Sequence, residues 1–238
     1  MLTLLGLGFV LGMRHALEAD HAAAVASLAT QSRSVFQTMK QGIVWGFGHT
    51  VTLFLFGSVV LILGVVIPER FAEALEFAVG LMLIGLGIDV FRRMRNERIH
   101  FHLHQHSHAA PHFHAHSHAP NIPHTQDAHQ HAHPPGFPYR AFMVGLMHGM
   151  AGSAALILLT LNTVMSPSMA IGYMAIFGAG SILGMGLLSV VIAIPLWYSA
   201  RSLTWIHQSL QGVVGISTIL LGGYVISQHS HWFMESFL

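Results

Sequence analysis

The chain has 238 residues, of which 53% are hydrophobic and only 8% are charged, with a formal net charge of +1. Because an average soluble domain carries about 25% charged residues, this composition excludes an ordinary water-soluble enzyme or binding module and favours a membrane protein. We therefore expect the lipid bilayer, and no nucleic acid, as its partner. Cysteine is absent, so any metal must be held by nitrogen and oxygen ligands, and 20 histidines are available to supply the nitrogen.

Six segments are long and apolar enough to cross a bilayer, which requires about 20 mostly apolar residues. They are residues 2–30, 43–66, 71–91, 140–163, 169–197 and 204–227. The first ten residues lack the basic region and the cleavage site of a signal peptide, so we expect them to belong to the first span. The predicted fold class is an all-α polytopic membrane bundle of six transmembrane helices.

A segment of different composition, rich in histidine and proline, separates the third span from the fourth. It predicts three units, namely a first three-helix half (1–91), a histidine-rich loop (92–139) and a second three-helix half (140–238). Short matches such as Gly12-Met13-Arg14-His15-Ala16 with Gly145-Leu146-Met147-His148-Gly149 favour an internal repeat. Because each half has an odd number of spans, the repeats would be inverted in the membrane, as in many secondary transporters.

Positive charges predict the orientation of the spans. The connections after the first, third and fifth spans hold Arg33, Lys40, Arg92, Arg93, Arg95, Arg98, Arg140 and Arg201, whereas the opposite side has only Arg70. The positive-inside rule therefore puts the histidine-rich loop in the cytoplasm and both termini outside. The expected location is the cell inner membrane, with a multi-pass topology.

The clearest chemical signal is Arg14-His15-Ala16-Leu17-Glu18-Ala19-Asp20-His21, which puts five ionisable residues inside the first apolar segment. Each arginine or aspartate at the centre of a transmembrane helix costs about 2.5–3.5 kcal/mol on insertion scales. On a continuous helix His15 and Asp20 would point away from the stripe shared by Arg14, Glu18 and His21. Either the helix is broken here around a polar cavity, or two separate clusters form.

Imidazole combined with a carboxylate suits nickel, cobalt, zinc or copper and disfavours calcium and magnesium. His15, Asp20 and His21 can supply three ligands, and His49 near the start of the second span is the natural fourth. The alternative is a buried polar network that only fixes the helix register. Arg14 and Glu18 are better explained as an ion pair one helical turn apart. A packing role explains His148 as well as a ligand role does.

These residues carry a resemblance to a known family. Arg14-His15-Ala16-x-x-Ala19-Asp20-His21 resembles the signature of the nickel/cobalt transporter (NiCoT) family, and Phe47-Gly48-His49-Thr50 resembles its second histidine motif. The resemblance implies a permease in which His15, Asp20, His21 and His49 recognise Ni2+ or Co2+ as the transported ion, with no catalytic cofactor.

The chain also departs from the NiCoT pattern in two ways. Its six predicted spans, against eight in the family's larger members, make it more similar to the short urease- and hydrogenase-accessory relatives. The run from His148 to Ser153 differs from the acidic, threonine-containing motif that the permeases carry in the second half. Metal identity and active transport are therefore both open at this point.

The histidine-rich loop has 13 histidines in the 34 residues from His100 to His133. Because the reference pKa of histidine is about 6.5, most of them are neutral at cytoplasmic pH and able to bind metal. The segment has too few apolar residues to form a core, so we expect it to be disordered without metal. It either buffers or senses metal, or passes it to cytoplasmic acceptors such as a metallochaperone, or it is a linker that transport does not need.

The predicted function is a nickel or cobalt permease that is not an enzyme. An exporter would use the same site in the opposite direction, and a non-transporting accessory protein would store metal and bind a metallochaperone. An intramembrane metalloenzyme with Glu18 as general base is disfavoured, because the His-Glu-x-x-His pattern is missing. No oligomeric state follows from the sequence.

Overall fold

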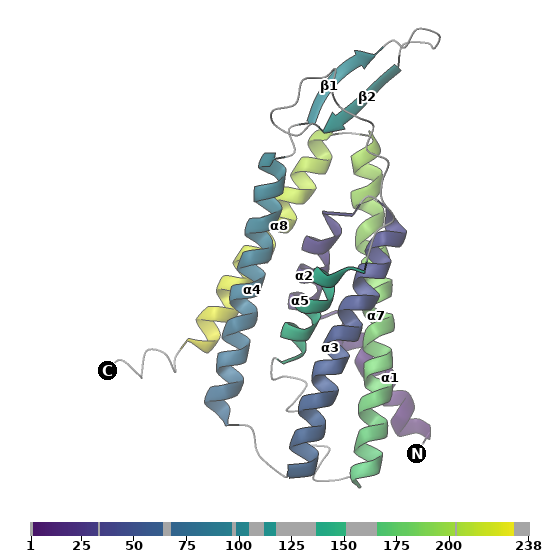
Figure 1. Ribbon diagram of the computed structural model, residues 1–238, viewed down its shortest axis with the longest axis vertical. Coiled ribbons are helices and arrows are strands. Elements are labelled where there is room, and N and C mark those ends of the chain that lie inside the picture. The colour runs from purple at the N-terminus through teal and green to yellow at the C-terminus, as the bar shows by residue number, and fades with distance from the viewer. Residues whose placement is uncertain are drawn as a thin grey trace, which may run out of the picture.

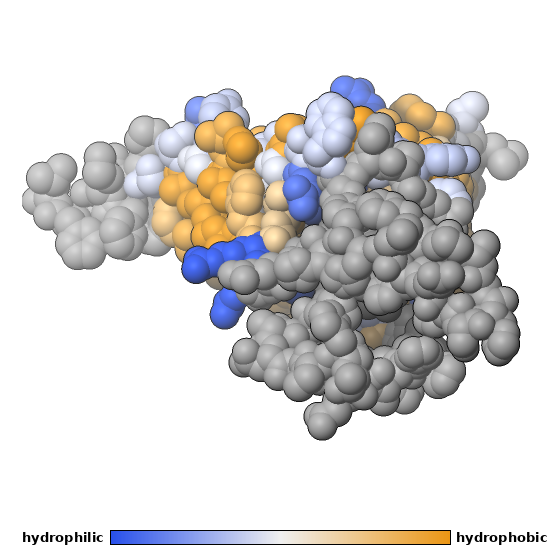
Figure 2. Space-filling view, turned by 90° about the horizontal axis from the view of Figure 1, so that it is seen from above, coloured by the Kyte–Doolittle hydropathy of each residue, from blue (hydrophilic) through white to orange (hydrophobic). Residues whose placement is uncertain are grey.

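The computed structural model describes residues 2–32, 34–63, 68–96, 99–104, 112–117, 137–150, 166–202 and 204–230. The described helices form an elongated bundle (Figure 1): α1 Leu2–His15, α2 Ala19–Ala29, α3 Val35–Leu63, α4 Glu69–Asn96, α5 Tyr139–Gly149, α7 Pro167–Ser202 and α8 Thr204–His229. Their sequences are rich in apolar residues, and large hydrophobic side chains such as Leu55, Val191 and Leu220 are mostly exposed. Seen from above, hydrophobic side chains likewise reach the surface (Figure 2). The bundle therefore presents apolar side chains outward.

Four of the described helices are long and apolar enough to cross a membrane, and they contain Val35–Val60, Glu69–Arg95, Ser168–Ala200 and Trp205–His229. They correspond to the second, third, fifth and sixth predicted spans. The fourth predicted span begins as α5, which ends at Gly149, and residues 151–163 of that span lie outside the described part of the chain. The helical class is confirmed, and the count of six spans stays a prediction.

The first predicted span, residues 2–30, is not one continuous helix. α1 ends at His15, and α2 begins at Ala19 after Glu18, whose backbone is extended. Two short hydrogen bonds close the turn, from the Leu17 amide to the Arg14 carbonyl (2.9 Å) and from the Glu18 amide to the His15 carbonyl (3.1 Å). Of the two arrangements that the charged motif allowed, the structure has the broken helix. The break brings side chains from both pieces to one point.

Glycines lie at close contacts between the described helices. A Cβ at Gly12 on α1 would overlap the carbonyl of Phe177 on α7, and a Cβ at Gly145 on α5 would overlap the carbonyl of Trp45 on α3. Because small residues let helix backbones approach closely in membranes, α1 packs on α7 and α5 packs on α3. α4 and α8 form a further close pair.

The range 92–139, for which the sequence predicts a disordered loop, contains regular structure. α4 continues to Asn96, and β1 Ile99–His104 pairs antiparallel with β2 His112–Ser117, with His102 opposite His114. Figure 1 shows this hairpin at the end of the bundle where α7 ends and α8 begins. Residues 105–111 and 118–136 lie outside the described part, so disorder there stays a prediction.

Candidate metal centre

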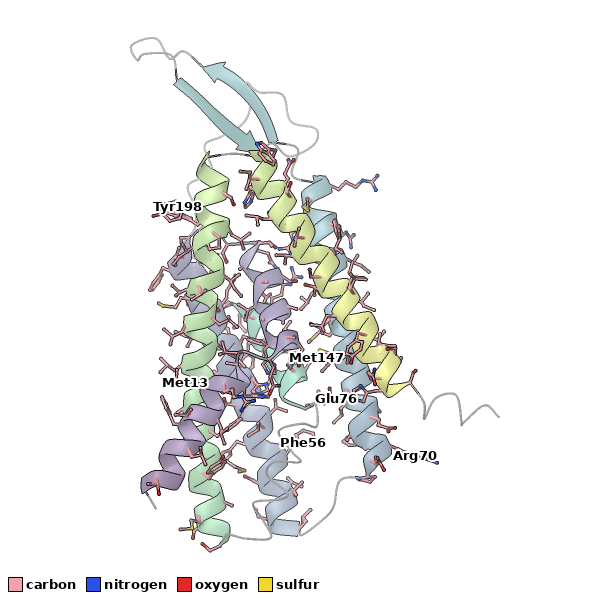
Figure 3. The ribbon with its side chains drawn as sticks, turned by 180° about the vertical axis from the view of Figure 1, so that it is seen from behind. Met13, Phe56, Arg70, Glu76, Met147 and Tyr198 are labelled. Carbon is pink, nitrogen blue, oxygen red and sulfur yellow. The ribbon has the colours of Figure 1, made fainter. Side chains whose placement is uncertain are left out.

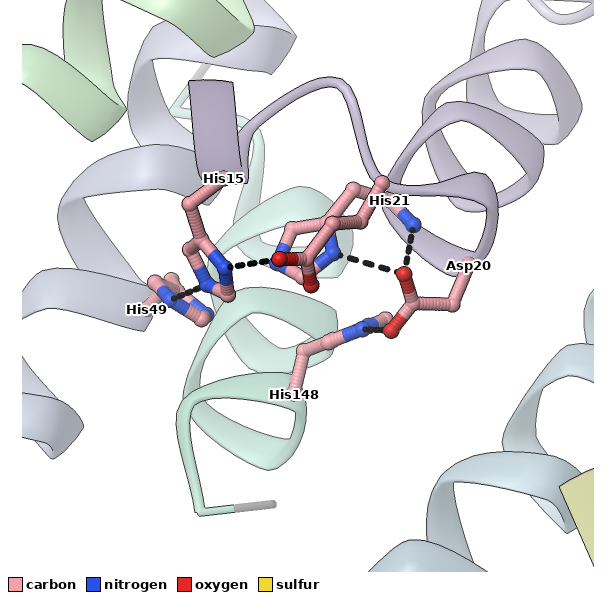
Figure 4. A network of polar contacts seen from close by, with 6 residues as sticks. His15, Asp20, His21, His49 and His148 are labelled. Carbon is pink, nitrogen blue, oxygen red and sulfur yellow. Dashed lines mark hydrogen bonds and ion pairs between the residues drawn. The ribbon is translucent and has the colours of Figure 1, made fainter. Parts of the chain in front are cut away.

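Four histidines and one aspartate meet at the break in the first predicted span (Figure 4). His15 ends α1, Asp20 and His21 lie in the first turn of α2, His49 lies in the middle of α3, and His148 lies near the end of α5. The four histidines are at most 5% exposed. The structure therefore brings together all four residues that the sequence predicted as metal ligands, and it adds His148.

The cluster lies at mid-height in the bundle. Met13 and Met147, which precede His15 and His148 closely in the chain, are both near the middle of the molecule (Figure 3). Arg70 lies at one end and Tyr198 lies toward the other end in the same view. If the long helices cross the bilayer, the cluster lies in the hydrocarbon region, where ionisable groups need a partner or an ion.

His148 reaches the cluster because α5 lies directly against α3. A Cβ at Gly149 would overlap the carbonyl of His49, and a Cβ at Gly48 would overlap the carbonyl of Phe142. This contact depends on glycine on both helices and joins segments that are far apart in the chain. The sequence signal for His148 was its place in the short match with the His15 motif, but that match alone does not bring the two histidines together.

Carboxylates hold three of the four imidazoles. Asp20 Oδ1 accepts a hydrogen bond from His21 Nδ1 (2.9 Å), and Asp20 Oδ2 accepts one from His148 Nε2 (2.8 Å). Glu18 Oε1 lies 3.0 Å from His15 Nδ1. A carboxylate behind a histidine fixes its tautomer and ring orientation, as is usual for histidines that bind metal.

The ion pair predicted between Arg14 and Glu18 is absent from the contacts of the described residues. That prediction required one continuous helix, in which residues four apart share a face. Because α1 ends at His15, the Glu18 side chain turns back to His15 instead.

Three imidazole nitrogens of the cluster have no hydrogen-bond partner within the described part of the chain. A neutral imidazole has one N–H and one lone pair. With Asp20 and Glu18 as acceptors, the protons lie on His15 Nδ1, His21 Nδ1 and His148 Nε2, and His49 Nε2 donates to His15 Nε2 at 3.2 Å. His21 Nε2, His49 Nδ1 and His148 Nδ1 are then buried lone pairs with no hydrogen-bond partner among the described residues. A divalent transition-metal ion is a suitable acceptor for such lone pairs.

The geometry offers two overlapping groups that could hold an ion. One is His15, His21 and His49, and the other is Asp20, His21 and His148; within each group the candidate ligand atoms lie within 4.8 Å of one another. Around a tetrahedral ion with metal–nitrogen bonds of about 2.1 Å, ligand atoms are about 3.4 Å apart. Small side-chain rotations would therefore bring either group to coordination distance.

We expect Asp20→Asn to weaken nickel binding by about 10–100-fold, the usual effect of removing a carboxylate that orients metal-binding histidines. The amide keeps the size of the side chain, but it cannot accept hydrogen bonds from His21 and His148 through both of its terminal atoms. Equilibrium dialysis of the detergent-solubilised protein measures the affinity. Glu69→Gln, at the exposed start of α4, removes the same charge away from the cluster and should leave the affinity unchanged. Equal affinities for Asp20→Asn and wild type would contradict the prediction.

Comparison with known proteins gives a clear relative. The urease accessory protein UreH of Bacillus sp. (strain TB-90) is 34% identical to the chain over 223 residues, which are 93% of this chain and 90% of that protein. The chain belongs to the UreH family of urease accessory proteins. No protein-family model and no solved structure matches it.

Membership of the UreH family confirms the urease-accessory part of the predicted resemblance, while membership of the nickel/cobalt transporter family stays a prediction. UreH is an accessory protein, and this chain accordingly belongs to a family of accessory proteins and is not an enzyme.

Proposed function

We propose that this UreH-family chain is a permease that moves Ni2+, or Co2+, across the cell inner membrane through the His15, Asp20, His21 and His49 site. The observation that carries the proposal is the set of buried imidazole lone pairs that have no hydrogen-bond partner among the described residues, at mid-height in an apolar bundle. Family membership favours nickel, since a urease accessory role is nickel-related. An ion entering the site exchanges its water for imidazole and carboxylate ligands and leaves when the halves of the bundle move.

The proposal includes six spans in two inverted halves, and helix contacts support it. The sequence match pairs Gly12 with Gly145. Gly12 lies against α7 and Gly145 lies against α3, and each of these helices is the middle predicted span of the opposite half. A second short match along the chain aligns Val79-Gly80 and Gly87 with Val214-Gly215 and Gly222. A Cβ at Gly80 would lie 2.9 Å from the Gly222 carbonyl, and a Cβ at Gly87 would lie 2.8 Å from the Gly215 carbonyl. If each residue is replaced by its counterpart in the other half, the contact between Gly80 and Gly222 becomes the contact between Gly215 and Gly87. The two contacts are therefore equivalent under the proposed repeat.

The proposed topology has residues 92–139 in the cytoplasm and both termini outside, as the distribution of lysine and arginine favours. The histidine-rich segment then binds the ion on the cytoplasmic side of the membrane and passes it to a cytoplasmic metallochaperone. The same arrangement would load an exporter, in which the ion moves in the opposite direction.

A second candidate function is a non-transporting accessory protein that holds nickel for urease assembly. The observation that favours it is the relative's own description, which names an accessory role and no transport. Both functions use the same metal centre, and only net movement of metal across a membrane separates them.

Uptake of radioactive nickel into sealed vesicles that contain the purified full-length protein tests the proposal, with cobalt and zinc as competitors. We expect His15→Ala to reduce the flux at least about 100-fold, since it removes a proposed ligand and removing an outer-sphere partner already costs 10–100-fold in metal affinity. His229→Ala changes a histidine that bonds to the Val225 carbonyl on α8, and its flux should equal that of wild type.

Replacing the 13 loop histidines with glutamine tests whether the loop is needed, and the flux should survive if the metal centre is the filter. No flux in either orientation, despite tight nickel binding, would overturn the permease and leave the accessory function.

A further inference from the structure

We propose that the metal centre has two overlapping positions on either side of the His21 imidazole, and that a single divalent transition-metal ion occupies one of them at a time. This inference rests on the proposed metal binding at the site but not on transport. Position A consists of His15, His21 and His49, and position B consists of Asp20, His21 and His148. His148 thereby becomes a metal ligand, and His21 becomes the ligand that both positions share.

Position A is made of imidazoles alone. His15 Nε2 and His49 Nε2 are 3.2 Å apart, close to the separation of about 3.4 Å between ligand atoms around a tetrahedral ion. The His21 ring centroid lies 4.4 Å from that of His15 and 5.2 Å from that of His49, and His21 Nε2 has no partner among the described residues. An ion between the three rings would bind this nitrogen.

Position B combines two imidazoles with the Asp20 carboxylate. The two oxygens of this carboxylate lie 2.9 Å from His21 Nδ1 and 2.8 Å from His148 Nε2, and the two imidazole centroids are 4.3 Å apart. An ion that replaces the two N–H protons would keep the same three partners. Unlike position A, position B offsets one of the two positive charges of the ion.

The chemistry of a neutral imidazole makes the two positions mutually exclusive. The ring has one lone pair, so His21 binds an ion through Nε2 in position A or through Nδ1 in position B, but not through both. When the ion moves from position A to position B, His21 Nδ1 gives its proton to water, and His21 Nε2 takes a proton from water. His148 likewise moves its proton from Nε2 to Nδ1. His49, which binds the ion in position A through Nε2 with its proton on Nδ1, moves that proton back to Nε2, where it again donates to His15 Nε2. Every ring therefore stays neutral, and the net number of protons is unchanged.

Nickel binding to full-length protein in which the 13 loop histidines are glutamine tests this inference. Titration calorimetry should give one Ni2+ per chain for this background, and also for His49→Ala, which keeps position B, and His148→Ala, which keeps position A.

The decisive comparison adds His15→Ala to each of these two variants. In the His49→Ala variant it should change the affinity less than about 2-fold, because position B contains neither residue. In the His148→Ala variant it should reduce the affinity at least about 100-fold, because it removes a ligand of the remaining position, a larger change than loss of an outer-sphere partner.

Equal losses of affinity on adding His15→Ala to the two variants would show one composite site and overturn the inference, as would two ions per chain in the unmodified centre. His49→Gln and His148→Gln repeat the comparison with side chains closer in volume if an alanine variant does not fold. The nickel flux of the same proteins is a separate measurement. Two positions without nickel flux would support this inference and overturn the permease proposal. One composite site with nickel flux would overturn this inference and support the permease proposal.

Discussion

His21→Ala should reduce nickel binding at the metal centre more than any other single substitution, by well over about 100-fold, given that loss of an outer-sphere partner alone costs 10–100-fold. His21 belongs to both groups of candidate ligands, and its ring contacts those of His15, His49 and His148. No complete three-ligand group would remain among the described residues. Titration of nickel into the full-length protein with glutamine in place of the loop histidines measures the loss.

The control for His21→Ala is His229→Ala, which removes a histidine from α8 and should leave nickel affinity and thermal unfolding unchanged. Because alanine at position 21 also leaves a small cavity beside Trp45, the unfolding temperature of the variant must be recorded alongside its affinity. A folded His21→Ala protein that binds nickel as tightly as wild type would show that the cluster of histidines and Asp20 is not the nickel-binding site.

Gly145→Ala should lower both the stability of the bundle and its affinity for nickel. The added Cβ would overlap the Trp45 carbonyl, and a backbone atom cannot rotate away as a side chain can. Overpacking of this kind typically costs about 1–3 kcal/mol. Since His148 lies one helical turn beyond Gly145, separation of α5 from α3 would also withdraw His148 from Asp20. Thermal unfolding in detergent and nickel titration measure the two effects.

The matched control for Gly145→Ala is Gly85→Ala on α4, where a Cβ would meet nothing within 4 Å in the described structure. It makes the same chemical change in another helix and should leave the unfolding temperature and the nickel affinity near those of wild type, or raise the stability slightly, because alanine favours the helix. An unfolding temperature for Gly145→Ala equal to that of Gly85→Ala would show that α3 and α5 are not held in the close contact described above.

Much of the site was predictable because its residues are close in sequence. His15, Asp20 and His21 lie within seven consecutive positions, and the cost of ionisable residues in an apolar span indicates a shared function. His49 follows from its glycine-flanked motif. The partner of Glu18 was predicted wrongly, because the spacing rule for helices applies only where the helix is continuous, and α1 ends three residues earlier.

The sequence by itself determined that this chain is a helical protein with apolar spans, and it determined which four residues are the candidate metal ligands. Composition and local spacing suffice for both, since hydrophobic length and ionisable clusters are properties of short segments. The tertiary structure decided how the chain breaks between His15 and Ala19, and it decided that His148 joins the cluster. The position of His148 depends on the contact of α5 with α3 through Gly145 and Gly149, which joins residues about a hundred positions apart and which no local pattern in the chain specifies.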